Sequence, residues 1–213
     1  MKILLYLFLC ILTVNCSGQK TIINKNKTMQ DYNIPTIDNQ LETFDIEVFN
    51  KESVRDKRIL TTNNSVIEED TQSFGYAQQT YPNDSYFSIL KLYFSNGKIK
   101  EKGVYFNNGS EYGTWYKFSE EGKLIKETNY NQPLNKIGWR YILNYCKRNN
   151  IPLTKGYTEN GYHTEIYFDK DVEKEDGIWT ITWQTAGDKL EEIKLHGASG
   201  WQISKKELEF INH

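Results

Sequence analysis

The chain has 213 residues, of which 26 are basic and 28 acidic, so its net charge is −2 at pH 7. This near balance lacks the basic character that a nucleic-acid-binding surface needs, and no nucleic acid is expected as a partner. Aromatic residues make up 14% of the chain and include 15 tyrosines, a composition that suits thin β-sheets and binding surfaces.

The first 15 residues have the pattern of a secretory signal peptide. A short positive start is followed by an apolar run over residues 3–14, which is too short to span a bilayer as a helix. With Cys16 directly after it, the stretch 12–16 resembles the signal of bacterial lipoproteins, in which this cysteine becomes the acylated first residue. The resemblance implies a lipid anchor at Cys16 and a place in the bacterial cell envelope, facing the periplasm or the cell surface. The alternative is an ordinary secretory signal that is cut nearby.

Removal of residues 1–15 leaves 198 residues with a net charge of −3, because Lys2 is the charged residue that is lost. This length allows one large domain or two small ones. Cys10 leaves with the signal and Cys16 would be acylated, so Cys146 has no cysteine partner and no internal disulfide is expected. Residues 16–40 are polar without a clear period, which predicts a lipidated N-terminus followed by a flexible tether.

Residues 41–132 predict a β-rich module. Its first apolar cluster, over 41–49, fits either a strand or a helix. From about residue 57 onward, short apolar runs alternate with turn signals, a pattern that predicts an antiparallel meander. The longest run, 86–94, has four residues at alternate positions that we expect on one apolar face. These residues are Ser88, Leu90, Leu92 and Phe94.

An internal repeat with an offset of 25 residues lies inside this module. It matches Gly97 to Gly122 and Tyr105 to Tyr130, and each unit reads as strand, glycine turn, strand. Together with the later Gly-x-Tyr/Phe, Asn-Gly and Gly-x-Trp steps, residues 92–130 resemble the MORN-type repeat, in the variant found in bacterial proteins labelled antitoxin components. The resemblance implies a sheet of stacked β-hairpins with a binding or scaffold role and no catalysis.

Residues 133–213 predict a second module of one helix and three strands. The apolar spacing predicts a helix over 135–149. Strands are expected at 164–168, 177–183 and 190–195, with a turn and a short further extended stretch after them. The helix-then-strands order resembles a PepSY domain, which implies an envelope binding or inhibitory module. The fold class expected for the whole chain is α+β, mostly an antiparallel β-hairpin repeat sheet followed by this helix-plus-three-strand module.

Patterns for catalysis and for metal binding are weak in this sequence. The run 169–177 begins like a calcium loop, but it lacks the glycine and the glutamate that an EF-hand requires, so a solvated loop between strands is expected. Cys146 and His163 could form a nucleophile and a base, but no oxyanion signature accompanies them. Cys146 on the apolar face of a helix is typical of a small core residue. We therefore expect no enzyme, no metal and no cofactor.

A group of aromatic residues in the repeat module is the best candidate for a partner-binding site, because interfaces favour Tyr and Trp. The alternative is ordinary packing within the sheet. The group consists of Tyr105, Tyr112, Trp115, Tyr116 and Tyr130. The function expected is that of a non-enzymatic envelope lipoprotein that meets the membrane through its N-terminal lipid and binds another protein. Two alternatives stay open: an immunity or antitoxin-type lipoprotein that neutralises a toxin in the periplasm and, less favoured, a hydrolase.

Overall fold

The computed structural model describes residues 32–131, 137–159, 161, 163–171 and 176–209. This part of the chain forms an α+β fold with two antiparallel sheets, the first of seven strands and the second of four. The elements in chain order are α1 (Ile46–Glu52), β1 (Lys57–Thr61), β2 (Ser65–Gln72), β3 (Gly75–Pro82), β4 (Phe87–Phe94), β5 (Ile99–Phe106), β6 (Glu111–Phe118), β7 (Leu124–Asn129), α2 (Trp139–Arg148), β8 (Glu165–Asp171), β9 (Asp176–Ala186), β10 (Lys189–His196) and β11 (Gln202–Glu209).

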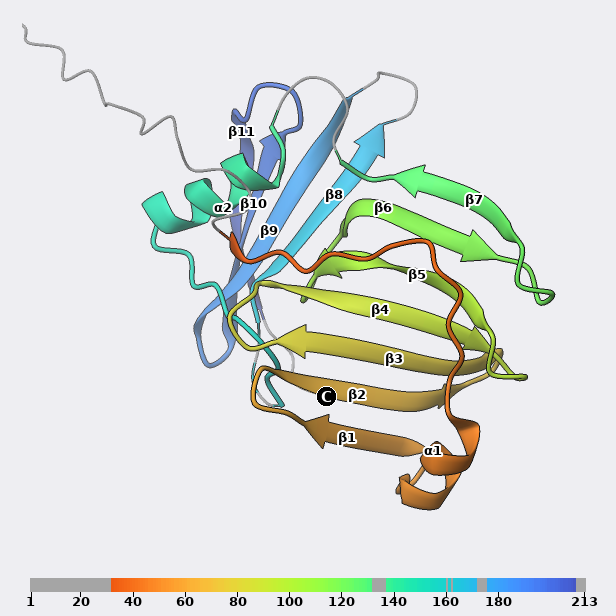
Figure 1. Cartoon of the computed structure of the whole chain (residues 1–213). Coiled ribbons are helices and arrows are strands. Elements are labelled where there is room, and N and C mark those ends of the chain that lie inside the picture. Colours follow the sequence, from red (N-terminus) through yellow and green to blue (C-terminus); the bar gives the residue numbers. More distant parts are fainter. Residues whose placement is uncertain (1–31, 132–136, 160, 162, 172–175, 210–213) are drawn as a thin grey trace, which may run out of the picture.

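The seven-stranded sheet is a meander in which every strand pairs with the next one along the chain (Figure 1). Two of its turns carry the sequence repeat. The turn at Gly97 and the turn at Gly122 are each closed by the same two backbone hydrogen bonds, all 2.8 to 2.9 Å long. Both glycines adopt a positive φ, +79° and +91°, which a residue with a β-carbon rarely adopts. The two predicted glycine turns are therefore confirmed as equivalent β-hairpins.

One face of this sheet, called here the covered face, lies under the beginning of the described chain. Residues 32–45 run across it and lead into α1 (Figure 1). The Asp45 carboxylate accepts the amide hydrogen of Val48 at 3.0 Å and so caps the helix. This cap explains why the sequence that also fitted a strand forms a helix.

A row of polar side chains crosses the covered face from edge to edge, one from each strand. Each member is paired directly with the next: Arg58, Glu69, Gln78, Lys91, Lys102, Tyr116 and Glu127. The row separates two apolar clusters. The smaller one consists of Phe44, Phe49, Tyr93, Ile99 and Phe118. On the other side of the row, apolar residues of β4 and β5 join a larger core shared with the second sheet.

The charges in this row find their partners on the crossing segment and on neighbouring strands. Lys102 has a fully buried side chain, and its ammonium group donates to Glu42 at 2.5 Å and to the carbonyl of Gln40 at 2.6 Å. Lys91 also pairs with Glu42, and Arg58 pairs with the buried carboxylate of Glu69. Because buried charges are costly unless they are paired, the crossing segment is an integral part of the fold.

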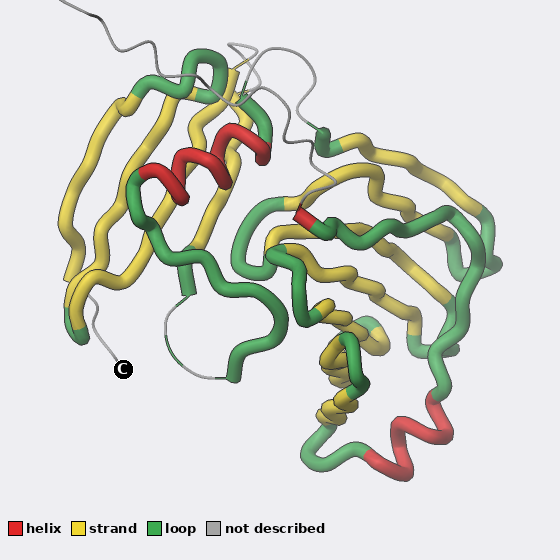
Figure 2. The backbone as a smooth tube through the Cα atoms, turned by 60° about the vertical axis from the view of Figure 1, so that its left-hand side comes forward, coloured by secondary structure: helices red, strands yellow, loops and turns green. Residues whose placement is uncertain are grey.

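The second sheet has the strand order β11-β10-β9-β8, and α2 lies across one of its faces (Figure 2). The apolar side of α2 is buried there, and Trp139 at its start connects the two sheets. Its ring stacks on Phe106 of β5 at 5.1 Å between centroids and meets Trp179 of β9 edge-on at 5.0 Å. The loop between β5 and β6 also bonds to β8, since the Ser110 amide donates to the carbonyl of Ile166 at 3.0 Å. One hydrophobic core therefore draws on both predicted modules.

Three details differ from the sequence prediction. The folded part begins before residue 41, because Tyr32 is 2% exposed and Ile34 and Ile37 pack on the core. The second sheet has four strands, because the stretch after the 197–200 turn continues as the full strand β11. On β4, the alternate set that begins at Ser88 does share a face, but it is the face opposite the covered one. The residues of β4 that join the two apolar clusters are Phe87, Ile89 and Tyr93.

Candidate functional site

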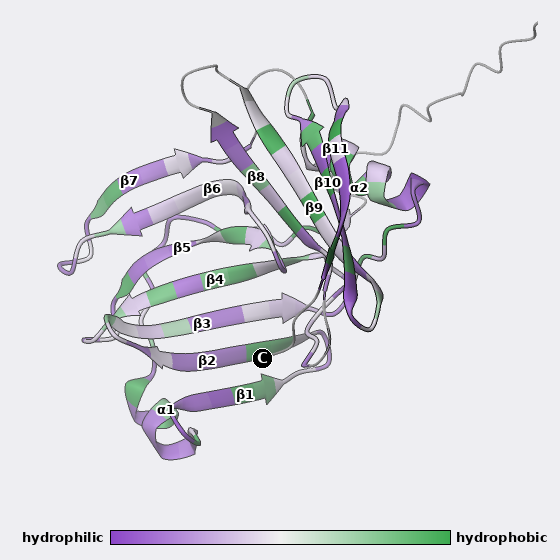
Figure 3. Ribbon diagram, turned by 180° about the vertical axis from the view of Figure 1, so that it is seen from behind, coloured by the Kyte–Doolittle hydropathy of each residue, from purple (hydrophilic) through white to green (hydrophobic). Residues whose placement is uncertain are grey.

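The second face of the seven-stranded sheet, called here the open face, carries apolar and aromatic side chains next to charged ones such as Glu68, Glu101 and Lys117. Residues paired directly across antiparallel strands share a face, and the strand register therefore assigns its members. The apolar and aromatic ones are Ile59, Val66, Ala77, Tyr81, Leu90, Leu92, Phe94, Tyr105, Trp115 and Tyr130. None of them belongs to either apolar cluster of the interior. Seen from behind, no other described element crosses the middle of these strands (Figure 3).

Trp115 is the most buried aromatic residue of the open face, at 9% exposure. Its indole lies over Gly103 of β5, where an added β-carbon would come within 2.1 Å of the ring. The indole nitrogen donates to the carbonyl of Val104 at 2.9 Å, and the ring meets Tyr130 edge-on at 6.0 Å. The absence of a side chain at Gly103 thus lets the Trp115 ring pack directly on the backbone of β5, and the hydrogen bond to Val104 fixes its position.

Tyrosines at the other end of the open face are partly buried beside one another. Burial raises the pKa of both Tyr81 and Tyr105 above the ordinary value of 10, so both phenols are neutral at any physiological pH. The Ser88 hydroxyl accepts a hydrogen bond from Gln79 at 3.2 Å. Neutral phenols and hydroxyls among aliphatic side chains are typical of protein-binding surfaces.

The structure divides the five predicted partner-binding residues between the two faces. Tyr105, Trp115 and Tyr130 lie on the open face. Tyr112 lies on the covered face, 5.3 Å from Phe87, and Tyr116 packs against the smaller cluster there. The five therefore do not form one surface, and three of them remain candidates.

Sequence reasoning missed the aliphatic part of the open face. The sequence predicts one shared apolar face for Leu90, Leu92 and Phe94 but does not mark them, or Tyr81, as binding residues. The signal that could have identified them is the run 86–94 itself, which is apolar at nearly every position. A strand that is apolar on both sides has a second surface that must be covered or used for binding.

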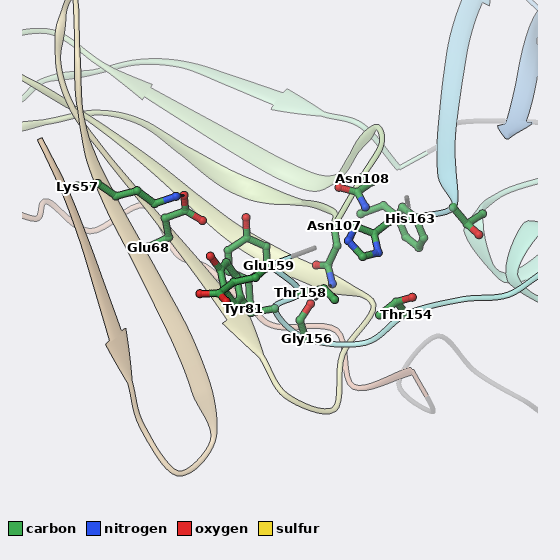
Figure 4. Close-up of a pocket in the computed structure, with 13 residues that line it drawn as sticks. Lys57, Glu68, Tyr81, Asn107, Asn108, Thr154, Gly156, Thr158, Glu159 and His163 are labelled. Atoms are coloured by element: carbon green, nitrogen blue, oxygen red, sulfur yellow. Dashed lines mark hydrogen bonds and ion pairs between the residues drawn. The ribbon is translucent and has the colours of Figure 1, made fainter. Parts of the chain in front are cut away.

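A pocket of about 250 Å³ lies at one end of the open face, between strands β1–β3 and the loop that precedes β8 (Figure 4). Lys57, Glu68 and Tyr81 line it from the sheet, and Glu159 and His163 line it from the loop. Tyr157 closes one side, with its ring edge-on to Tyr81 at 5.2 Å. The Asn107 amide donates to the carbonyl of Gly156 at 3.1 Å and so holds the loop against the sheet.

The charges in this pocket are largely matched. Lys57 and Glu68 form an ion pair, and the hydrogen bond from Lys57 to Glu68 raises the pKa of the lysine. Glu159 is the other carboxylate in the lining. Among the described residues, no three His, Cys, Asp or Glu side chains are grouped closely enough to hold a metal ion. The pocket is therefore suited to a small polar group that forms hydrogen bonds with amides, hydroxyls and imidazole.

Cys146 and His163, considered as a nucleophile and base, lie in different environments. Cys146 is 0% exposed in the main core, and burial raises the pKa of its thiol to about 12. His163 lines the polar pocket. A nucleophilic thiol needs a low pKa and access to substrate, and Cys146 has neither.

The remaining sequence features have these positions. Residues 169–171 and 176–177 belong to β8 and β9, and the middle of the calcium-like run lies outside the described residues. Signal residues 1–15, Cys16 and the first part of the predicted tether also lie outside them. No helix in the described part is long and apolar enough to cross a membrane.

Comparisons of the chain with protein-family models, with characterised proteins and with solved structures find no match.

Proposed function

We propose that this chain is a non-enzymatic lipoprotein of the bacterial cell envelope that binds another protein through the open face. The observation that supports the proposal most strongly is the open face itself. It combines aliphatic residues on β4 with aromatic residues on β3, β5, β6 and beyond, and it contributes to neither interior cluster. Partly exposed aliphatic and aromatic side chains that share one sheet face with charged residues are typical of an interaction site.

The composition of the open face favours a protein partner. Binding surfaces concentrate their energy in a few large anchors, with Tyr and Trp enriched. Trp115 is fixed by the Gly103 contact and by its hydrogen bond, so little conformational entropy would be lost when a partner packs on it. The polar pocket shares Tyr81 with the open face. The pocket could therefore hold a polar side chain of the partner protein at the edge of the open face.

The decisive experiment compares two variants that each introduce one aspartate. In Leu92→Asp the charge lies in the middle of the open face. In the matched control, Val54→Asp, it replaces a residue that is 73% exposed away from that face. Each purified chain is used to capture proteins from envelope extracts of the source bacterium, and the yield of any stoichiometric partner is measured.

We expect a partner to be captured by the wild type and by Val54→Asp, and to be lost with Leu92→Asp. Both variants must have the wild-type melting temperature for the comparison to be valid. Equal capture by all three chains would refute the assignment to the open face. Failure of the wild type to capture any stoichiometric protein would refute the protein-binding function.

The envelope location is tested separately through Cys16. The mature wild-type chain should carry the mass of attached acyl chains and fractionate with membranes, whereas Cys16→Ala should lose both properties. An unmodified and soluble wild-type chain would support the ordinary secretory signal. The open-face proposal does not depend on that outcome.

A further inference from the structure

The outer side of α2 is a basic surface with aromatic side chains along its edges. Arg140, Lys147 and Arg148 are exposed on it, and α2 contains no acidic residue. Tyr141 of the same helix lies at the edge of this surface, and the Arg148 guanidinium is 5.7 Å from the centre of its ring. Because the apolar side of α2 is buried in the core, the helix itself is an ordinary amphipathic surface helix, and the feature that would attract anionic lipid headgroups is its exposed Arg and Lys residues.

The turn between β10 and β11 extends this surface and adds an exposed tryptophan. The Tyr141 hydroxyl donates to the carbonyl of Gly200 at 3.4 Å, and the Tyr145 hydroxyl donates to the Gln202 side chain at 3.4 Å. Trp201, between these two contact points, is 79% exposed, the largest exposure of any big apolar side chain in the described chain. Tryptophan is the residue that favours the boundary between water and lipid.

The N-terminal chain reaches the fold at this same helix. The Tyr32 hydroxyl donates to Asn144 of α2 at 2.8 Å, and the Lys147 ammonium lies 4.6 Å from the centre of the Tyr32 ring. Fifteen residues lie between Cys16 and Tyr32, and a fully extended chain from one to the other spans at most about 58 Å. Residues 17–31 contain three lysines and one aspartate. A lipid at Cys16 would therefore hold the fold within that distance of the membrane, through a lysine-containing connection that joins the fold beside α2.

We propose that the outer side of α2 and the β10–β11 turn form a surface that binds anionic lipid headgroups. This inference rests on the envelope location proposed above, and it names the side of the molecule that faces the membrane. Basic residues attract the headgroups and Trp201 inserts at the interface. The seven-stranded sheet, which carries the open face, is then left accessible to a partner.

The test is vesicle sedimentation with the chain from residue 16 onward, carrying Cys16→Ser so that no acyl chain contributes. The vesicles consist of phosphatidylcholine with or without phosphatidylglycerol. The first variant combines Arg140→Gln, Lys147→Gln and Arg148→Gln. Its matched control combines Lys117→Gln, Lys123→Gln and Lys126→Gln, three exposed lysines of the β6–β7 hairpin. A third variant, Trp201→Ala, leaves the charge unchanged.

The wild type should bind the vesicles that contain phosphatidylglycerol, and added salt should weaken binding. The α2 variant should bind at least about tenfold more weakly, since each basic residue near an anionic surface contributes roughly a fivefold change. Trp201→Ala should also bind less, while the β6–β7 control should bind within about twofold of the wild type.

Equal loss in the α2 variant and in the control would show a general charge effect and would overturn the proposal. Absence of wild-type binding would overturn it as well. The Leu92→Asp variant distinguishes this inference from the proposed function, because it should lose the protein partner and still bind vesicles. Vesicle binding without partner capture would reject the protein-binding function and leave the lipid-binding surface in place. Partner capture without vesicle binding would reject the lipid-binding surface and leave the protein-binding function in place.

Discussion

The indole of Trp115 occupies the space that a side chain at position 103 would need. An alanine β-carbon at Gly103 would lie 2.1 Å from the ring, a separation that real structures do not allow. The Gly-x-Tyr/Phe step of the sequence repeat therefore has a physical reason here. Glycine on β5 makes room for the tryptophan of β6, and this contact shapes the open face.

Gly103→Ala should displace Trp115 and lower the free energy of unfolding by about 1–3 kcal/mol, the usual cost of overpacking. The measurements are chemical denaturation and the tryptophan emission spectrum of the folded state. Gly187→Ala is the matched control, because no atom lies within 4 Å of a β-carbon there. If the two variants had the same stability, the proposed packing of Trp115 on Gly103 would be wrong.

Lys102→Met should destabilise the fold although the two side chains have similar lengths. The substitution leaves the carbonyl of Gln40 without its hydrogen bond and leaves Glu42 with Lys91 alone. Loss of hydrogen bonds from a charged donor costs about 1.5–3 kcal/mol each. Hydrogen exchange should also become faster in residues 38–44. The exposed Lys123→Met serves as the control, and equal stability of both variants would contradict a structural role for the polar row.

The ion pairs of Glu42 predict a dependence of stability on pH. Burial disfavours its ionised form, but hydrogen bonds from Lys102 and Lys91 outweigh this and hold the pKa of Glu42 below its ordinary value of 4.5. Because the folded-state pKa is lowered, the stabilisation is complete above that value. It is lost as the pH falls through the lower pKa of the folded state.

Wild type and Glu42→Gln should therefore differ in unfolding free energy at neutral pH, and the difference should shrink as the solution is acidified through the lowered pKa of Glu42. Denaturation curves at a series of pH values provide the measurement. Other carboxylates affect both chains alike, so the difference between the chains isolates Glu42. A difference that stays constant down to the lowest pH would rule out its ionisation as the cause.

Local sequence signals predicted the hairpins well, and interactions between distant segments explain most of the differences. The turns at Gly97 and Gly122 require only local glycine chemistry, so the sequence was sufficient to place them. The buried Lys102 could not be predicted in the same way. Its partners lie about 60 residues earlier on the crossing segment, and no local pattern marks a charge that a distant segment will neutralise.

The candidate site was predictable in part. Trp115 and Tyr116 are neighbours on β6, and the alternation of a strand already assigns them to opposite faces. That simple rule would have separated the open-face residues from Tyr116. It could not have chosen which face stays open, because residues 32–40 of the covering segment were expected to be tether. The polar pocket was equally beyond prediction, since its lining joins β1–β3 to a loop about 80 residues later.

The most direct test of the central claim is photocrosslinking in the source bacterium from a crosslinking amino acid placed at position 92 or at position 54. We expect one discrete adduct from position 92, on the open face, and none from position 54. The same adduct from both positions, or an adduct from position 54 alone, would contradict the claim that the open face binds a protein partner.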